Sequence, residues 1–239
     1  MVIPTVNEEA SLPGTLACLR GLDPPPLEVI VVDGGSADAT ARIAARWGAR
    51  VVEVRPPGRA RQLDAGARRA TGSILCFLHA DTVVPPHAMR TIGRTLEDPT
   101  VALAGFTSIM RGERGVQRVT SFHNWIKTYY APMLYRPFAG LFRGLRLLFG
   151  DQVMFCRRGD YLAVGGFDPE APIMEEADLC LRLNRLGRIR QLSERVYSSD
   201  RRVAKWGVLR ANLLYLTVAL GWGVGYPKER LRMLYEDVR

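Results

Sequence analysis

The chain has 239 residues, enough for one large domain or two small ones. Its 47% apolar and 24% charged residues exclude a disordered chain, and four scattered cysteines without a C-x-x-C pair argue against a zinc site or a disulfide framework. The net charge of +9 suits nucleic acid, an anionic membrane surface or a phosphorylated substrate, and equally an ordinary solvated basic surface. No signal-peptide pattern opens the sequence, and together these features predict a cytoplasmic protein.

Short apolar runs alternate with helical patterns over the first hundred residues. The predicted strands span residues 1–4, 27–32, 50–54 and 73–78, and the predicted helices between them span 8–22, a stretch that ends at 47, and 60–70. This alternation predicts an α/β fold with a mostly parallel, Rossmann-like sheet and helices on both faces. Ligands of such sheets bind at the carboxyl ends of the strands, which is where Asp33 and Asp81 lie in the predicted sheet.

The pattern changes after residue 105. Residues 111–149 are basic and aromatic, and we expect helices and loops there whose rings either bind an acceptor or fill the core. Strands are predicted at 150–156 and 189–196, with a helix at 175–186 between them.

The chain is expected to form one domain over residues 1–239. We divide it into a first half (1–105), a second half (106–202) and a C-terminal helical segment (203–239). Residues 213–224 of that segment are apolar but too few to span a bilayer, which needs about 20. They are expected to form a core helix or, alternatively, an interfacial helix at the inner face of the membrane.

Candidate ligand-binding residues follow two of the predicted strands. Asp33, beside Gly34, can accept hydrogen bonds from a nucleobase or ribose, or can simply stabilise a turn. Asp81 can coordinate Mg²⁺ or Mn²⁺ and so help to neutralise a departing diphosphate. His79 is either a further ligand or a packed imidazole.

Three carboxylates open the helix predicted at 175–186. Repulsion among Glu175, Glu176 and Asp178 can raise one pKa enough for a general base, although acidic residues also favour helix N-termini. Asp178 is spaced to pair with Arg182 on the surface. Several arginines are candidates for phosphate contacts or for surface charge: Arg59, Arg61, Arg201 and Arg202.

In order along the chain, these segments resemble the family-2 glycosyltransferases of the GT-A fold. The resemblance covers about residues 1–200 and is carried by VIPTVNEE at 2–9, VIVVDGGSADAT at 29–40, LCFLHADT at 75–82, GGFD at 165–168 and IMEEAD at 173–178. The sequences HADT, GDQ at 150–152 and SSDRR at 198–202 are similar to one bacterial subgroup, often labelled arsenosugar-biosynthesis-type glycosyltransferases.

The resemblance implies an inverting, metal-dependent hexosyltransferase that uses a nucleotide sugar, expected to be a UDP-sugar. It also implies that residues 1–105 are the nucleotide-sugar-binding half and residues 106–202 the acceptor-side half. The acceptor is left open between a small molecule and a lipid-linked one. Glu176 would be the base, with Glu175 as a competing candidate, and Asp81 would hold Mn²⁺ or Mg²⁺. The implied nucleotide contacts are Pro4, Thr5, Asn7, Glu8, Asp33, Gly34, Arg61, His79 and Ala80. The implied acceptor or diphosphate contacts are Asp151, Gln152, Arg201 and Arg202.

Two positions depart from the family pattern. His79 stands where the family usually has an acidic residue, and Glu176 stands where it usually has Asp. A non-catalytic nucleotide-sugar-binding protein therefore stays an alternative. A sugar nucleotidyltransferase is a weaker one, because no glycine-rich, lysine-containing phosphate loop lies near the N-terminus. Nucleic-acid binding is not expected, since the basic residues are dispersed and no recognition motif is visible.

Overall fold

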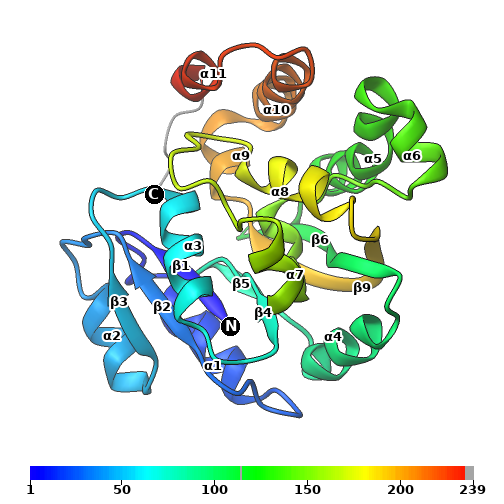
Figure 1. Cartoon of the computed structure of the whole chain (residues 1–239). Coiled ribbons are helices and arrows are strands. Elements are labelled where there is room, and N and C mark those ends of the chain that lie inside the picture. The colour runs from blue at the N-terminus through cyan, green and yellow to red at the C-terminus, as the bar shows by residue number, and fades with distance from the viewer. Residues whose placement is uncertain (114, 235–239) are drawn as a thin grey trace.

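A computed structural model describes residues 1–113 and 115–234 (Figure 1). Its first sheet has three parallel strands in the order β1-β2-β3. They are β1 (Val2–Thr5), β2 (Ile30–Asp33) and β3 (Arg50–Glu53). The helices that follow them in sequence are α1 (Leu12–Arg20), α2 (Thr40–Trp47) and α3 (Arg59–Arg69). The alternation of strand and helix predicted for this part of the chain is confirmed.

The second sheet is mixed rather than parallel. Its strands pair in the order β4-β8-β6-β9-β5, with β7 paired to the end of β6. They are β4 (Ile74–Cys76), β5 (Thr82–Val83), β6 (Val101–Gly112), β7 (Gly115–Val116), β8 (Phe155–Arg157) and β9 (Arg188–Ser199). Only β6 and β9 run parallel, and an isolated parallel bridge from Val2 to Phe77 joins the two sheets. The prediction of a mostly parallel sheet therefore holds for the first sheet and is wrong for the second.

Hydrophobic cores lie on both faces of the strands. Successive strand residues point to opposite faces, so Val2 belongs to one core and Ile3 to the other. Helix α3 covers the first face, while α1 and α4 (Ala88–Glu97) cover the second. Gly66 lets α3 approach the sheet closely, because a Cβ there would lie 2.4 Å from a Val2 methyl carbon.

The later half contributes the remaining helices. They are α5 (Arg118–Tyr135), α6 (Pro137–Phe142), α7 (Arg158–Ala163), α8 (Glu175–Leu183), α9 (Arg201–Trp206), α10 (Val208–Gly223) and α11 (Lys228–Leu234). The strand predicted at 150–156 is wrong over its first half, because residues 150–152 form a 3-10 turn. Gln152 closes that turn by accepting the backbone N–H of Phe149 on its side-chain oxygen. The helix predicted from residue 8 begins only at Leu12.

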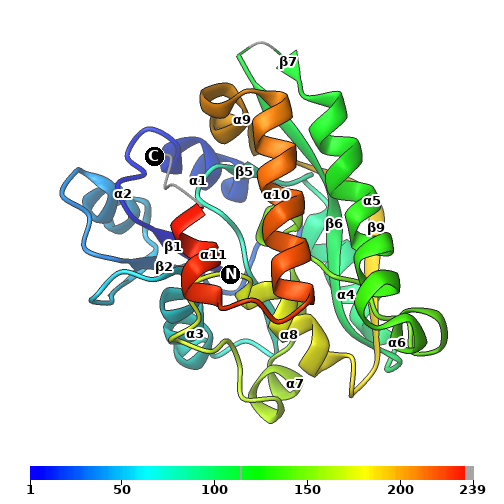
Figure 2. The ribbon, with the colours of Figure 1, turned by 90° about the horizontal axis from the view of Figure 1, so that it is seen from above.

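The C-terminal helices lie over the middle of the molecule, with α10 alongside α5 (Figure 2). Asp178 of α8 accepts a hydrogen bond from the Trp222 indole at 3.2 Å and forms an ion pair with Lys228. The predicted pair with Arg182 is wrong, since Arg182 donates to backbone carbonyls instead. Within the described residues, no helix is both long and apolar enough to cross a membrane.

Candidate active site

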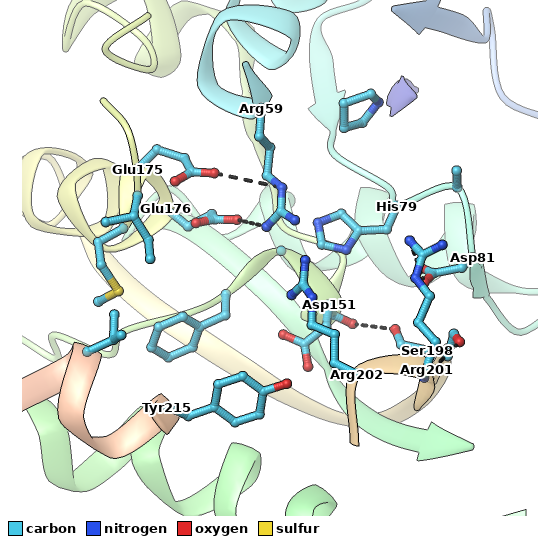
Figure 3. A pocket seen from close by; sticks show the side chains of 18 of the residues that line it. Arg59, His79, Asp81, Asp151, Glu175, Glu176, Ser198, Arg201, Arg202 and Tyr215 are labelled. Atoms are coloured by element: carbon cyan, nitrogen blue, oxygen red, sulfur yellow. Dashed lines mark hydrogen bonds and ion pairs between the residues drawn. The ribbon is translucent and has the colours of Figure 1, made fainter. Parts of the chain in front are cut away.

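A cavity of about 600 Å³ opens beyond the carboxyl ends of β1 and β4. Figure 3 shows it with Glu175 and Glu176 on one side and Asp81 on the other. Its walls come from segments that are far apart in the sequence. The predicted site residues among those that line it are Pro4, Thr5, Glu8, His79, Ala80, Asp81, Asp151, Glu175, Glu176, Arg201 and Arg202. The strand-end residues and the helix-start residues that the sequence singled out therefore meet around one space.

The strand-end wall carries two carboxylates that share one arginine. Arg201, at the start of α9, donates to both oxygens of Glu8 at 2.9 and 2.6 Å and lies 3.3 Å from Asp81. Burial raises the pKa of Asp81, and the nearby Arg201 opposes that rise. Two negative groups around one guanidinium, with Arg202 close by, leave this wall near charge balance.

His79 is half-buried in the same wall, and its Nε2 atom is shielded from solvent and has no hydrogen-bond partner among the described residues. Burial lowers the pKa of this imidazole, and three arginines, Arg59 first among them, lower it further. A neutral imidazole with an unbonded nitrogen is a suitable ligand for a transition-metal cation.

The residues present suit a metal ion that takes only some of its ligands from the protein. Residues 1–113 and 115–234 contain no group of three or more His, Cys, Asp or Glu placed to hold a metal ion. Asp81 and His79 would supply one or two ligands, so the diphosphate of a bound nucleotide would have to supply others. Oxygen and imidazole ligands suit Mn²⁺, and a site that the protein leaves open lets the substrate complete the ligand shell.

The opposite wall carries the acidic start of α8. Glu175 and Glu176 are both buried, and Arg59 of α3 faces them at 3.9 and 3.6 Å. Burial raises the pKa of Glu175 to about 7, repulsion from Glu176 adds to the rise, and Arg59 opposes it. A carboxyl group that titrates near neutral pH can take up a proton during a reaction.

Gly150 lies where His79 of one wall and Glu176 of the other approach each other. A Cβ atom at this position would lie 2.2 Å from Nε2 of His79 and 2.8 Å from Oε1 of Glu176. Any side chain would therefore collide with both groups, so the space between them depends on the glycine.

Helices α5 and α10 form the remaining wall. Lys127 of α5 is buried, and its ammonium lies over the rings of Phe149 and Tyr215 at 3.9 and 5.5 Å. Burial lowers the pKa of Lys127, while Asp151 opposes the change. Asn124 donates to Asp151 at 2.8 Å and fixes its carboxylate.

Five predicted site residues do not line the cavity: Asn7, Asp33, Gly34, Arg61 and Gln152. Asp33 accepts the backbone N–H groups of Gly35 and Ser36 at 3.0 and 2.8 Å, so it stabilises its own turn. Arg61 pairs with Glu170 at 2.5 Å, away from the cavity. The ligand contacts expected of all five stay predictions.

Lys127, Asn124 and Tyr215 line the cavity although the sequence did not single them out as site residues. A lysine on a helix is usually solvated, and no local pattern distinguishes Lys127 from the other cations of the chain. The only available signal was its position within the aromatic stretch of residues 111–149.

Comparison with known structures agrees with this architecture. A mannosyltransferase from Pyrobaculum calidifontis, PcManGT, in complex with GDP-Man and Mn²⁺ matches with a TM-score of 0.68 at 20% identity, over 98% of this chain and 67% of that one. The glucosyl-3-phosphoglycerate synthase of Mycobacterium tuberculosis, solved with Mn²⁺, UDP and glucosyl-3-phosphoglycerate, matches with a TM-score of 0.64 at 23% identity, over 95% and 79% of the two chains. These similarities show that the fold is GT-A.

Sequence comparison identifies the family. An uncharacterized glycosyltransferase of Mycobacterium tuberculosis is 42% identical over 81 residues, and the match covers 34% of this chain and 35% of that relative. The sequence model of glycosyl transferase family 2 matches residues 1–161, about two thirds of the chain. The chain therefore belongs to glycosyl transferase family 2.

Proposed function

We propose that the chain is an inverting, metal-dependent glycosyltransferase that moves a sugar from a nucleotide-sugar donor to an acceptor hydroxyl. The observation that carries this proposal is that Asp81 and the pair Glu175–Glu176 line the same cavity from opposite walls. One wall suits an anionic diphosphate with its cation, and the other suits proton transfer.

In the proposed step, the acceptor oxygen attacks the anomeric carbon from the face opposite the diphosphate. The new C–O bond forms while the bond between that carbon and the phosphate oxygen breaks, so the configuration inverts. Glu176 takes the proton of the acceptor hydroxyl, and the nucleoside diphosphate leaves with the bonding electrons. General-base assistance of this kind typically contributes about 10²–10⁴ in rate.

Cationic groups on the strand-end wall would stabilise the leaving group. A divalent cation held by Asp81, with His79 beside it, would supply charge neutralisation of the diphosphate. Arg201 and Arg202 line the cavity and add fixed positive charge near the same place. Arg59 faces Glu175 and Glu176 and can keep both carboxylates oriented.

We propose a UDP-sugar as the donor. Two solved structures of the same fold support a nucleoside diphosphate sugar with Mn²⁺, since one holds UDP and the other GDP-Man. The carboxylates around the cavity also suit sugar transfer better than nucleotidyl transfer, which would need a glycine-rich, lysine-containing phosphate loop near the N-terminus.

The test is donor turnover with Mn²⁺, measured as UDP release from UDP-sugars with and without candidate acceptors. We expect turnover that EDTA abolishes and that Asp81→Ala lowers at least 100-fold, while Asp23→Ala, an exposed aspartate in a surface ion pair, leaves it unchanged. Full activity of Asp81→Ala would refute the mechanism. Binding without turnover across donors would instead favour a non-catalytic binding protein, and pyrophosphate release from a nucleoside triphosphate and a sugar phosphate would favour a nucleotidyltransferase.

A further inference from the structure

The outer side of α10 carries an apolar stripe that faces solvent. Leu209, Leu213, Leu220 and Val224 follow one another at helical spacing, and their exposed fractions range from 41% at Leu220 to 78% at Val224. Soluble helices usually turn such a stripe toward the core. Here the opposite side of α10 is the buried one, and it lines the cavity through Val218.

Helix α5 carries a second exposed apolar stripe on the same side of the molecule. The two helices run in the same direction (Figure 2) and meet where His123 contacts Asn212 at 2.7 Å. Successive residues of a helix point in directions about 100° apart. Phe122 comes one residue before the contact residue of α5, and Leu213 comes one residue after the contact residue of α10. Their side chains are therefore rotated from the contact by the same angle, in opposite senses. In parallel neighbouring helices, those two rotations point to one common side.

This surface, which we call the α5–α10 face, comprises the outward apolar residues of both helices: Val119, Phe122, Leu209, Leu213, Leu220 and Val224. Phe122 is 60% exposed and Val119 65%. The short helix α6, which follows α5, also carries three exposed apolar residues: Phe138, Leu141 and Phe142. Exposed apolar residues gathered on one side of two neighbouring helices mark a candidate interaction site.

The charge around the α5–α10 face has one sign. Residues 114–150 contain no Asp or Glu, and neither do residues 201–228, so all 24 acidic residues of the chain lie elsewhere. Both segments carry basic residues, and those exposed near the face are Arg118, Arg136, Arg143, Lys205 and Arg210. An apolar surface with a basic surround and no carboxylates complements an anionic, apolar partner.

We propose that the α5–α10 face docks on an anionic lipid bilayer. Leucine and phenylalanine side chains would enter the boundary between headgroups and acyl chains, and the arginines would contact lipid phosphates. Each basic residue near an anionic surface increases the binding constant about fivefold, and high salt screens this attraction. The inference is independent of the proposed glycosyl transfer, because no residue of the face lines the cavity.

The test is flotation of the full chain with two kinds of vesicle, pure phosphatidylcholine and phosphatidylcholine with one quarter phosphatidylglycerol. We expect binding to the anionic vesicles, a loss of at least tenfold in partition coefficient in 0.5 M NaCl, and little binding to the neutral ones. The double variant Phe122→Glu, Leu213→Glu should lower the partition coefficient at least tenfold. Leu27→Glu is the control, because Leu27 is an even more exposed leucine, at 79%, on a loop before β2.

Circular dichroism and thermal melting establish that each variant is folded, and Val119→Ser, Leu209→Ser is a milder second pair should the first not fold. The proposal is overturned if the wild-type chain does not float with anionic vesicles, or if Leu27→Glu lowers binding as much as the double variant. Light scattering adds one further outcome. A dimer that the double variant dissociates, without vesicle binding by the wild type, would assign the face to a second copy of the chain.

Discussion

The two acidic walls of the cavity contain the same kinds of side chain but balance their charge differently. On the strand-end wall, Arg201 contacts Glu8 at 2.6 Å and Asp81 at 3.3 Å. On the helix-start wall, Arg59 lies 3.9 Å from Glu175 and 3.6 Å from Glu176, which are themselves buried next to each other. Both walls set two carboxylates against one arginine, but the arginine of the first wall contacts its carboxylates more closely than the arginine of the second.

This difference indicates distinct chemical roles. Burial raises the pKa of Glu175 to about 7 and repulsion from Glu176 adds to the rise, so this wall suits proton transfer. Burial raises the pKa of Asp81 as well, but there the neighbouring Arg201 opposes the rise. Carboxylate oxygens of this kind are the ligands that Mg²⁺ and Mn²⁺ prefer.

The largest expected effect is at the helix-start wall. Glu176→Gln keeps the shape of the side chain and removes its ability to accept a proton, so kcat should fall about 10²–10⁴-fold while the donor Kd changes by less than about threefold. Steady-state kinetics and calorimetry measure the two quantities. Glu170→Gln, an exposed carboxylate in a surface pair, is the control and should keep full activity. An active Glu176→Gln would move the base assignment to Glu175.

The next prediction concerns Gly150, where the two walls approach each other. Gly150→Ala places a methyl group against both His79 and Glu176, and we expect kcat to fall about 10–100-fold with a destabilisation of about 1–3 kcal/mol from overpacking. Gly93→Ala is the control, since nothing lies within 4 Å of a Cβ there. Wild-type kinetics for Gly150→Ala would mean that the two walls do not act across this space.

A third prediction concerns pH. Because the folded pKa of Glu175 is about 7 against an ordinary value of 4.5, the folded protein holds this proton where the unfolded chain has lost it. Stability should therefore fall as pH rises from about 4.5 to about 7, and stay flat with respect to this group below that range. Glu175→Gln removes this pH-dependent loss of stability, and we expect the variant to be more stable than wild type by about 1–3 kcal/mol at pH 8.

Urea unfolding of wild type and Glu175→Gln at pH 4.5 and pH 8 measures this effect. The difference between the two proteins should be larger at pH 8. The kcat of the variant should stay within about tenfold of wild type. An equal difference at both pH values would contradict the raised pKa of Glu175.

The smallest effect separates two neighbouring arginines of α3. Arg61→Ala should change kcat/KM by less than about threefold, because its partner Glu170 lies away from the cavity and exposed ion pairs contribute little. Arg59→Ala should lower kcat/KM more strongly, since Arg59 faces both carboxylates of the helix-start wall. Similar losses in the two variants would support the predicted contact of Arg61 with the donor.

Much of the first half of the fold could be predicted because its signals are local. Strands are predicted by apolar runs such as residues 27–32, and helices by periodicity within ten to fifteen residues, with a proline-rich break between elements. None of these signals requires knowledge of distant partners. The turn at residues 150–152 escaped prediction because it depends on the side chain of Gln152 bonding back to Phe149, which an apolar run does not reveal. The mixed second sheet was missed for a related reason: the direction of a short strand depends on its neighbours.

The sequence by itself determined the family, the order of the secondary structure and the acidic residues that carry the proposed chemistry. Only the tertiary structure decided how their charges pair, because side chains such as Glu8 and Arg201 are 193 positions apart yet form one ion pair. The same holds for Asp178, which pairs with Lys228 rather than with its helical neighbour. Coulomb energy depends on distance and burial in space, and neither is encoded by spacing along the chain.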